Sequence, residues 1–212
     1  MKRSTKFYQD LEVIQMVKSK ISFADYEPKD CREAFSVIMA RQITALMFHD
    51  EMADLFDFLG LRGFKRMHEY QYLAESAEHR GMSRYFMNHH GMLLDCGELD
   101  PITVIPDDWY KYTRDDVSAT TRQQAVQRAM QQYRQWETDT KALYETCATY
   151  LISWKKIADF NKVNDLIKDV DEELKYLERL CLELQAVDYE ASYIETLQDK
   201  YHEKYKEKYS LE

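Results

Sequence analysis

The sequence predicts an all-α protein: an antiparallel four-helix bundle with one long connection between its second and third helices. Five glycines and three prolines in 212 residues leave few positions for tight turns, so long helices should dominate. Apolar residues recur at alternating spacings of three and four over four long stretches, as in helices that bury one face. Residues 92–117 contain two prolines and lack that spacing, so they form the connection.

The first two helices are predicted over residues 29–59 and 64–88, joined by a turn over residues 60–63 with a glycine at each end. Pro28 suits the start of the first helix, and Gly91 suits the end of the second. Residues at this spacing form one stripe along the buried face of each helix. The stripe of the first helix contains Phe35, Ile38, Gln42, Ala45, His49, Met52, Phe56 and Leu59. The stripe of the second contains His68, Tyr72, Glu75, His79, Met82 and Phe86.

The third helix is predicted from Ser118 and the fourth from a break between residues 155 and 161, with Asp159 or Asn161 as its N-cap. A short amphipathic helix is expected within residues 1–27. Another is expected after Val187, with residues 202–210 solvated or frayed. A bundle whose helices simply alternate up and down needs only short connections, whereas a bundle with a crossover needs one of the length of residues 92–117. We therefore expect one domain over residues 1–212, with its core bundle at about residues 29–185.

Composition excludes several classes of partner. The net charge of −9 argues against nucleic acid or an anionic membrane surface. No window approaches eighteen uninterrupted apolar residues, so no membrane span is predicted. The basic start of the chain lacks an apolar segment, so no secretory signal is visible. The four cysteines form no CxxC pair, and we interpret them as reduced thiols, mostly core filler, of a cytoplasmic protein.

Three polar residues on the apolar stripes should lie at one level of the bundle. Gln42 lies eighteen residues before Gly60, and Glu75 and His79 lie fifteen and nineteen residues after it. Burying such groups without partners costs several kcal/mol. Either a metal site or a cluster of polar side chains hydrogen-bonded to one another would account for their burial.

The later helices could supply two more carboxylates. Glu137 follows Trp136, and Glu173 is flanked by apolar residues, whereas Glu172 has polar neighbours and leans outward. Carboxylates together with imidazoles, one set per helix, are the ligands of a di-iron site. Taken singly, each carboxylate is more often a surface residue. His49 could be a metal ligand, a hydrogen-bond donor to a carboxylate ligand, or a satisfied core histidine.

Several short motifs occur in the order found in ferritins, over residues 31–185. Residues 60–64 resemble the turn between the first two helices of bacterial ferritins. Glu75, followed by Glu78 and His79, resembles the second-helix motif of a glutamate and then a histidine. The remaining likenesses are Asp107-Asp108-Trp109 before the third helix, Glu137, and Asp171-Glu172-Glu173 in the fourth helix.

The resemblance implies a ferritin-like fold, iron as the metal, Fe(II) oxidation by O2 with iron storage, and a homo-oligomer. Metal would be held by Glu75, His79, Glu137 and Glu173, with Gln42 and His49 beside it. Gln42 stands where the family has a glutamate, and the spacing leaves open whether His79 or Glu78 faces inward. A di-iron site, a mononuclear site, a site completed by His49, and no site all remain open.

Two other functions compete with ferroxidase activity. One is a metal-free ferritin-like bundle with a structural or interaction role, whose polar centre is a hydrogen-bonded network that fixes helix register. The other is a di-metal oxidase or oxygenase that acts on an organic substrate. Gln42 in place of a carboxylate favours the metal-free alternative.

Overall fold

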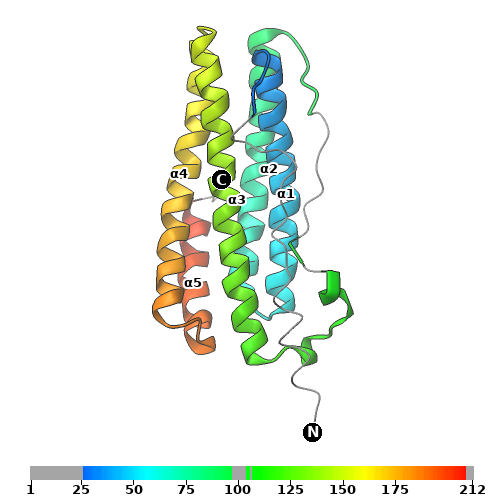
Figure 1. Ribbon diagram of the computed structural model, residues 1–212, viewed down its shortest axis with the longest axis vertical. Coiled ribbons are helices and arrows are strands. Elements are labelled where there is room, and N and C mark those ends of the chain that lie inside the picture. Colours follow the sequence, from blue (N-terminus) through cyan, green and yellow to red (C-terminus); the bar gives the residue numbers. More distant parts are fainter. Residues whose placement is uncertain (1–25, 97–103, 106, 209–212) are drawn as a thin grey trace.

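The computed structural model describes residues 26–96, 104–105 and 107–208 (Figure 1). Its elements are α1 (Cys31–Phe58), α2 (Arg62–His90), the 3-10 helices η3 (Asp107–Lys111) and η4 (Arg114–Asp116), α3 (Ala119–Ser153), α4 (Ile157–Ala186) and α5 (Ala191–Lys208). No strand occurs in the described part of the chain. The predicted all-α class is therefore confirmed. Most of the predicted N-terminal helix falls in residues 1–25, outside the described residues.

The helices α1 and α2 form an antiparallel pair, as predicted, with a shorter turn than expected. Asp30 caps α1 by accepting a hydrogen bond from the backbone N–H of Glu33 at 2.9 Å. Gly60 adopts a left-handed φ of +76° that a side chain would disfavour. The helix α2 already begins at Arg62, so Gly63 is helical rather than part of the turn.

The connection from α2 to α3 crosses the length of the bundle (Figure 1). The chain leaves α2 at one end of the bundle and enters α3 at the other end, so α2 and α3 run in the same direction. Val104 and Trp109 are buried, and the N–H of Val104 donates to Glu51 Oε2 at 2.5 Å. The predicted long crossover is confirmed, and these contacts attach it to the bundle.

The start of α3 agrees with the prediction, and the start of α4 does not. Ser118 caps α3 by accepting a hydrogen bond from the N–H of Thr121 at 3.1 Å. Lys155 has a φ of 59°, and α4 begins directly afterwards at Ile157. The predicted caps of α4, Asp159 and Asn161, are therefore wrong. Asp159 lies within the first turn of α4 and is buried.

The helix α5 packs against both α2 and α4, alongside the half of the bundle near the α1–α2 turn (Figure 1). Gln198 Oε1 accepts a hydrogen bond from the Gly63 N–H at 2.9 Å. The expectation of a solvated tail after residue 201 fails at His202, which is buried and whose ring stacks on Tyr70. Most of α5 is therefore part of the packed structure.

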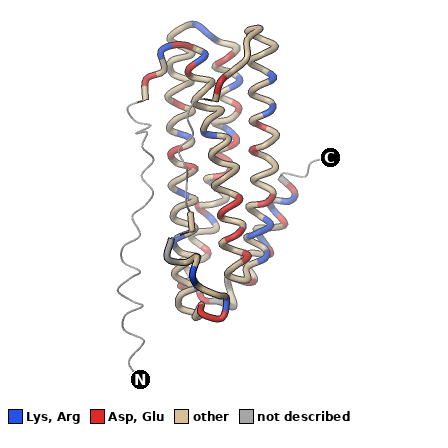
Figure 2. The backbone as a smooth tube through the Cα atoms, turned by 90° about the vertical axis from the view of Figure 1, so that its right-hand side faces the viewer, with Lys and Arg blue, Asp and Glu red and all other residues tan. Residues whose placement is uncertain are grey.

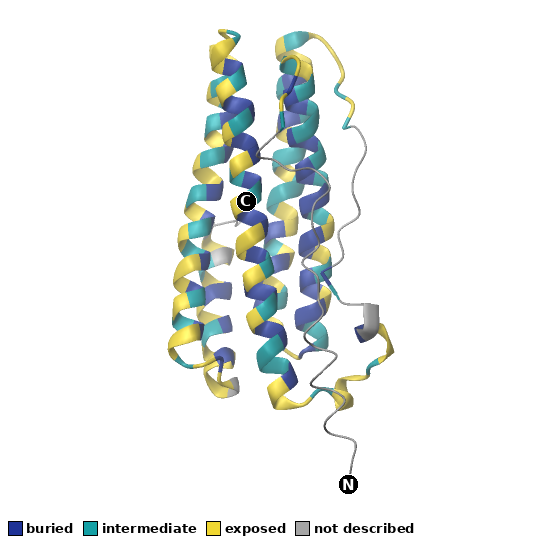
Figure 3. Ribbon diagram, in the orientation of Figure 1, coloured by how far each residue is buried: buried dark blue, intermediate teal, exposed yellow. Residues whose placement is uncertain are grey.

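The core consists of two apolar clusters on either side of a polar middle, and buried residues line the inner faces of all the long helices (Figure 3). One cluster, near the α1–α2 turn, includes Phe56, Phe64 and Leu180. The other, near the opposite end, includes Phe35 and Phe86. Acidic and basic residues are interspersed along the helices (Figure 2). No helix in the described ranges is long and apolar enough to cross a bilayer, and all four cysteines are free thiols.

Replacement of Gly63 by alanine should detach or displace α5. A Cβ at this position would lie 2.8 Å from the backbone carbon and oxygen of Gln198, which cannot move without shifting α5. We expect Gly63→Ala to lower the free energy of unfolding by about 1–3 kcal/mol, as overpacking does. Urea unfolding and protease cleavage within α5 measure the effect.

The matched control is Gly81→Ala on the same helix, where a Cβ would meet nothing within 4 Å. Alanine there should raise stability by about 0.5–1 kcal/mol, because glycine is a poor helix former. Equal stability changes in the two variants would contradict close packing of α5 on Gly63.

Candidate functional site

A layer of buried polar residues separates the two apolar clusters. Its members come from all four bundle helices: Arg41, Gln42, Thr44, His49, His68, Gln71, Glu137, Thr140 and Glu173. A polar layer this large inside a bundle requires compensation for the lost hydration. The contacts of each group determine what the layer can bind.

Three carboxylates of the layer interact with one another from three helices. Glu137 of α3 and Glu173 of α4 are 3% and 7% exposed, so neither points to bulk solvent. Glu75 of α2 is half-buried, but its Oε2 is enclosed. Burial, followed by the negative charges of Glu78, Glu137 and Glu173, raises the pKa of Glu75 well above its usual value. This arrangement is unfavourable for three ionised carboxylates without a further positive charge.

Arg41 provides one positive charge inside the layer. Its Nε donates to Thr140 Oγ1 at 2.8 Å, and an Nη donates to the Trp136 carbonyl at 2.7 Å. The guanidinium also lies 3.2 Å from the centre of the Trp136 ring. Burial lowers the pKa of Arg41, and the charges of Glu137 and Glu75 oppose that shift, so the group stays charged at neutral pH.

Sequence reasoning missed Arg41, although the spacing contained a signal. Arg41 lies three residues after Ile38 and four before Ala45, the same rhythm that singled out Gln42. Both neighbours are therefore on the buried side of α1. The expectation that arginine is almost never fully buried unless paired favoured Gln42 alone.

Four ligand-type side chains of α1 and α2 have enclosed atoms without hydrogen-bond partners. These atoms are Nε2 and Oε1 of Gln42, Nε2 of His68, Oε2 of Glu75 and Nδ1 of His79. His79 and Glu78 are both half-buried, so neither side chain lies fully inside or fully outside the bundle, and the choice between them stays open. Burial lowers the pKa of His79, and a hydrogen bond to the backbone of Met39 opposes that shift. Metal binding by these residues remains a prediction.

His49 forms a buried pair with His68, so its ring contacts another histidine. Their Nδ1 atoms lie 3.0 Å apart, so one ring donates and the other accepts. Burial lowers the pKa of His49 to about 3, and burial together with the neighbouring His49 lowers that of His68 well below its usual value. Both rings are therefore neutral at pH 7, and Nδ1 of His49 is occupied by its partner.

Tyr133 links this pair to the carboxylates. Its ring contacts both histidines, and its hydroxyl donates to Glu173 and accepts from Gln71 Nε2 at 2.7 Å. His68 belongs to the predicted stripe of the second helix and Tyr133 keeps the same three-four spacing in the third, which predicts burial and no further role. Their partners lie on other helices, so no spacing within one helix could identify them.

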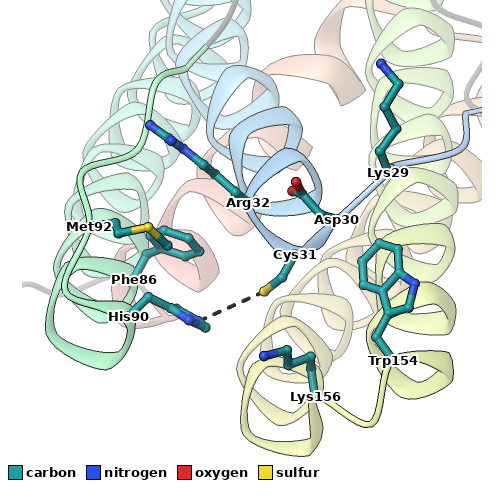
Figure 4. Close-up of a pocket in the computed structure, with 9 residues that line it drawn as sticks. All are labelled: Lys29, Asp30, Cys31, Arg32, Phe86, His90, Met92, Trp154 and Lys156. Atoms are coloured by element: carbon teal, nitrogen blue, oxygen red, sulfur yellow. Dashed lines mark hydrogen bonds between the residues drawn. The ribbon is translucent and has the colours of Figure 1, made fainter.

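A second group of ligand-type residues lies at the end of the bundle where α1 and α4 begin and α2 ends. Cys31 Sγ lies 4.0 Å from His90 Nε2 (Figure 4). The thiol donates to Asp159 Oδ2 at 3.4 Å, and His90 Nε2 lies 2.9 Å from Asp159 Oδ1. Tyr85 donates to the same Oδ1 at 3.0 Å. Within the described ranges, this is the only set of three such residues whose ligand atoms all lie within 4.8 Å of one another.

Sequence reasoning missed this end group because each member had an ordinary explanation. Cys31 was interpreted as core filler, His90 as a helix end and Asp159 as a cap. The available signal was their common position at helix ends that meet at one end of the bundle. Burial, followed by the charge of Asp159 and its hydrogen bond, raises the pKa of the Cys31 thiol to about 12.

The histidine pair should make stability fall in mild acid. Each buried neutral histidine has a folded-state pKa below its unfolded value, so the unfolded chain binds more protons and stability decreases below about pH 6.5. Between pH 7 and 5 the pair should cost up to roughly 4 kcal/mol of unfolding free energy. Urea unfolding at both pH values measures the loss.

The His49→Leu/His68→Leu variant should lack this extra loss, because leucine does not titrate. His89→Leu, at an exposed position of α2, is the matched control and should retain it. An identical pH dependence in wild type and the double variant would contradict a neutral buried pair.

Comparison with known proteins supports the fold and gives no relative by sequence. No family model matches the chain, and no curated protein matches it by sequence. A solved structure of Archaeoglobus fulgidus ferritin engineered into a closed form is 16% identical, with a TM-score of 0.65 over 84% of this chain and 97% of that one. A humanized archaeal ferritin is 15% identical, with a TM-score of 0.67 over 84% and 98% of the two chains. The chain therefore has the ferritin-like fold, in a divergent form.

Proposed function

We propose that the chain binds a divalent metal ion at the centre of the bundle, with Fe(II) as its substrate, through Glu75, Glu137 and Glu173. The observation that carries the proposal is the set of enclosed, unpartnered atoms on Glu75, Gln42 and His79. A buried polar atom without a partner costs about 1–3 kcal/mol. A cation bound among these oxygens and the imidazole nitrogen would remove that cost.

The neutral side chain of Gln42 favours one divalent ion over two. Glu75, Glu78, Glu137 and Glu173 supply four negative charges when ionised, and Arg41 supplies one positive charge, so the formal net charge is −3. Gln42, where a carboxylate would add another negative charge, contributes only a neutral amide oxygen. One divalent ion leaves a single negative charge, whereas two would leave a net positive charge. Among the alternatives raised by the sequence, a mononuclear site is therefore the best supported.

Each residue has a distinct role in this proposal. Glu75 anchors the ion, because burial and then repulsion from the neighbouring carboxylates raise its pKa, and a bound cation opposes both effects. Tyr133 orients Glu173 by donating to it, and Arg41 attracts Glu137. His49 is held by His68, so it contributes through packing and not as a ligand. The ferritin-like fold suggests two further activities to test. They are oxidation of the bound Fe(II) by O2 and iron storage.

A second candidate function is a metal-free bundle with a structural or interaction role. The observation that favours it is Arg41, a permanent cation inside the layer that already offsets part of the carboxylate charge. Hydrogen bonds linking Gln71, Tyr133 and Glu173 across three helices could then serve mainly to fix helix register.

Replacement of Glu75 distinguishes the two functions. If the centre binds metal, Glu75→Ala should weaken Fe(II) binding more than about 100-fold, since it removes a charged ligand. It should leave the apo protein as stable as wild type or more stable, because carboxylate repulsion decreases. Anaerobic calorimetry with Fe(II) and Mn(II) in a Cys31→Ser background measures the centre without the end group, and urea unfolding measures stability.

A matched pair on α4 controls for general loss of surface charge. Glu173→Gln should weaken binding, whereas Glu172→Gln, one residue away and exposed, should not. If wild type takes up no metal and Glu75→Ala lowers stability by roughly 1–3 kcal/mol, the metal-free function replaces the proposed one. Oxygen consumption after addition of Fe(II) tests oxidation separately.

We also propose that the chain, as one domain, assembles into homo-oligomers. Large apolar side chains remain exposed on several elements, including Leu93, Ile157, Leu182 and Tyr193. Burial of such side chains against copies of the same chain would remove apolar surface from water. Light scattering coupled to size exclusion should give a mass several times that of the 25.4 kDa chain, and a monomer at micromolar concentration would contradict the proposal.

A further inference from the structure

We propose that Cys31, His90 and Asp159 form a second metal site, for a borderline transition-metal ion such as Zn(II). This end site would be separate from the central carboxylates. Its ligand atoms come from the first turn of α1, the last turn of α2 and the first turn of α4, far apart in the sequence. The site is independent of the proposed central site, since no residue is shared.

The folded chain brings the three side chains toward one point. Cys31 follows the N-cap Asp30, and His90 is the last residue of α2 before the left-handed Gly91. Asp159 is 1% exposed and contacts both Cys31 and His90, which line a pocket. In Figure 4 the Cys31 sulfur and the His90 ring point toward each other across the space between α1 and α2.

The distances fit a tetrahedral ion after small side-chain movements. Bonds of about 2.3 Å to sulfur, 2.0–2.1 Å to nitrogen and 2.0–2.2 Å to oxygen give ligand-to-ligand distances of about 3.4–3.6 Å. Sγ lies 4.0 Å from Nε2 and 3.4 Å from Oδ2, and Nε2 lies 2.9 Å from Oδ1, so Cys31 and His90 contact different oxygens of Asp159. With one ligand atom taken from each residue, the three atoms all lie within 4.8 Å of one another.

The same geometry does not suit nucleophilic catalysis. In a cysteine–histidine–acid relay the acid binds one ring nitrogen and the thiol faces the other. Here Nε2 of His90 contacts Asp159 and also faces Cys31. Three atoms that converge on one position are the arrangement that an ion requires.

The surroundings support the ligands and leave room for another. Tyr85 donates to Asp159 Oδ1, and the ring of His90 packs against Phe86 with centroids 4.4 Å apart. Such neighbours orient ligands in metal sites. The site opens into a pocket of about 480 Å³. Thiolate, carboxylate and neutral imidazole would balance a divalent charge, and water or an anion could occupy a fourth position.

Cobalt(II) is a suitable probe for the full-length protein, because thiolate ligation gives it an intense near-ultraviolet charge-transfer band. We expect wild type to bind one Co(II) with this band, and Zn(II) to displace it. Cys31→Ser and His90→Asn should each lose the band or weaken Co(II) binding at least tenfold. Cys96→Ser, which removes another half-buried thiol, should not change it. Circular dichroism confirms that each variant is folded.

Failure of this site can be distinguished from failure of the central one. Glu75→Ala should retain the thiolate band even if it loses Fe(II) binding. Absence of the band in wild type, or its retention with unchanged Co(II) affinity in folded Cys31→Ser or His90→Asn, would overturn the proposal. The cluster would then be a salt bridge between His90 and Asp159 with a hydrogen-bonded thiol.

Discussion

The burial of charge at the middle of the bundle is the constraint on which the other features depend. Glu137, Glu173 and Arg41 are removed from water, and each would cost several kcal/mol without compensation. Their compensating groups lie on other helices. Arg41 of α1 bonds to α3, and Tyr133 of α3 bonds to Glu173 of α4. A shift of one helix along another would break these contacts, so the polar layer fixes register while the two apolar clusters provide the driving force for packing.

The fifth helix covers the apolar cluster near the α1–α2 turn. It packs on α2 and α4 beside the apolar cluster near the α1–α2 turn, with Gly63 permitting a backbone approach that any side chain would prevent. Its turn relies on left-handed backbone at Asp188 and Tyr189. Glu75 lies on the same helix as Gly63, so the position of α2 affects both the attachment of α5 and the centre.

The sequence predicted the helices, the crossover and the inward position of Gln42, His49 and Glu173, because three-four spacing directly reports which face of a helix is apolar. The burial of Glu137 did not follow from spacing, which leaves a single carboxylate more often at the surface. The sequence also could not predict partners. His68, Tyr133 and Asp159 acquire their roles from residues 19, 40 and 128 positions away. Spacing within a helix says nothing about which faces meet at a given height. Arg41 was missed for a different reason, since a buried arginine is uncommon unless its compensation is known.

The two proposed sites would select different ions by ligand chemistry. The central layer offers carboxylate and amide oxygens with one imidazole, and such hard ligands suit Fe(II) and Mn(II). The end group adds a thiolate, which favours Zn(II) and disfavours the harder ions. The two groups also differ in their access to solvent. The end group opens to a pocket, whereas Oε2 of Glu75 at the centre is enclosed. An ion at the helix ends would join α1, α2 and α4, and an ion at the centre would replace charge repulsion among α2, α3 and α4. The fold can therefore hold two metals in distinct roles, one that ties helix ends together and one that neutralises the interior.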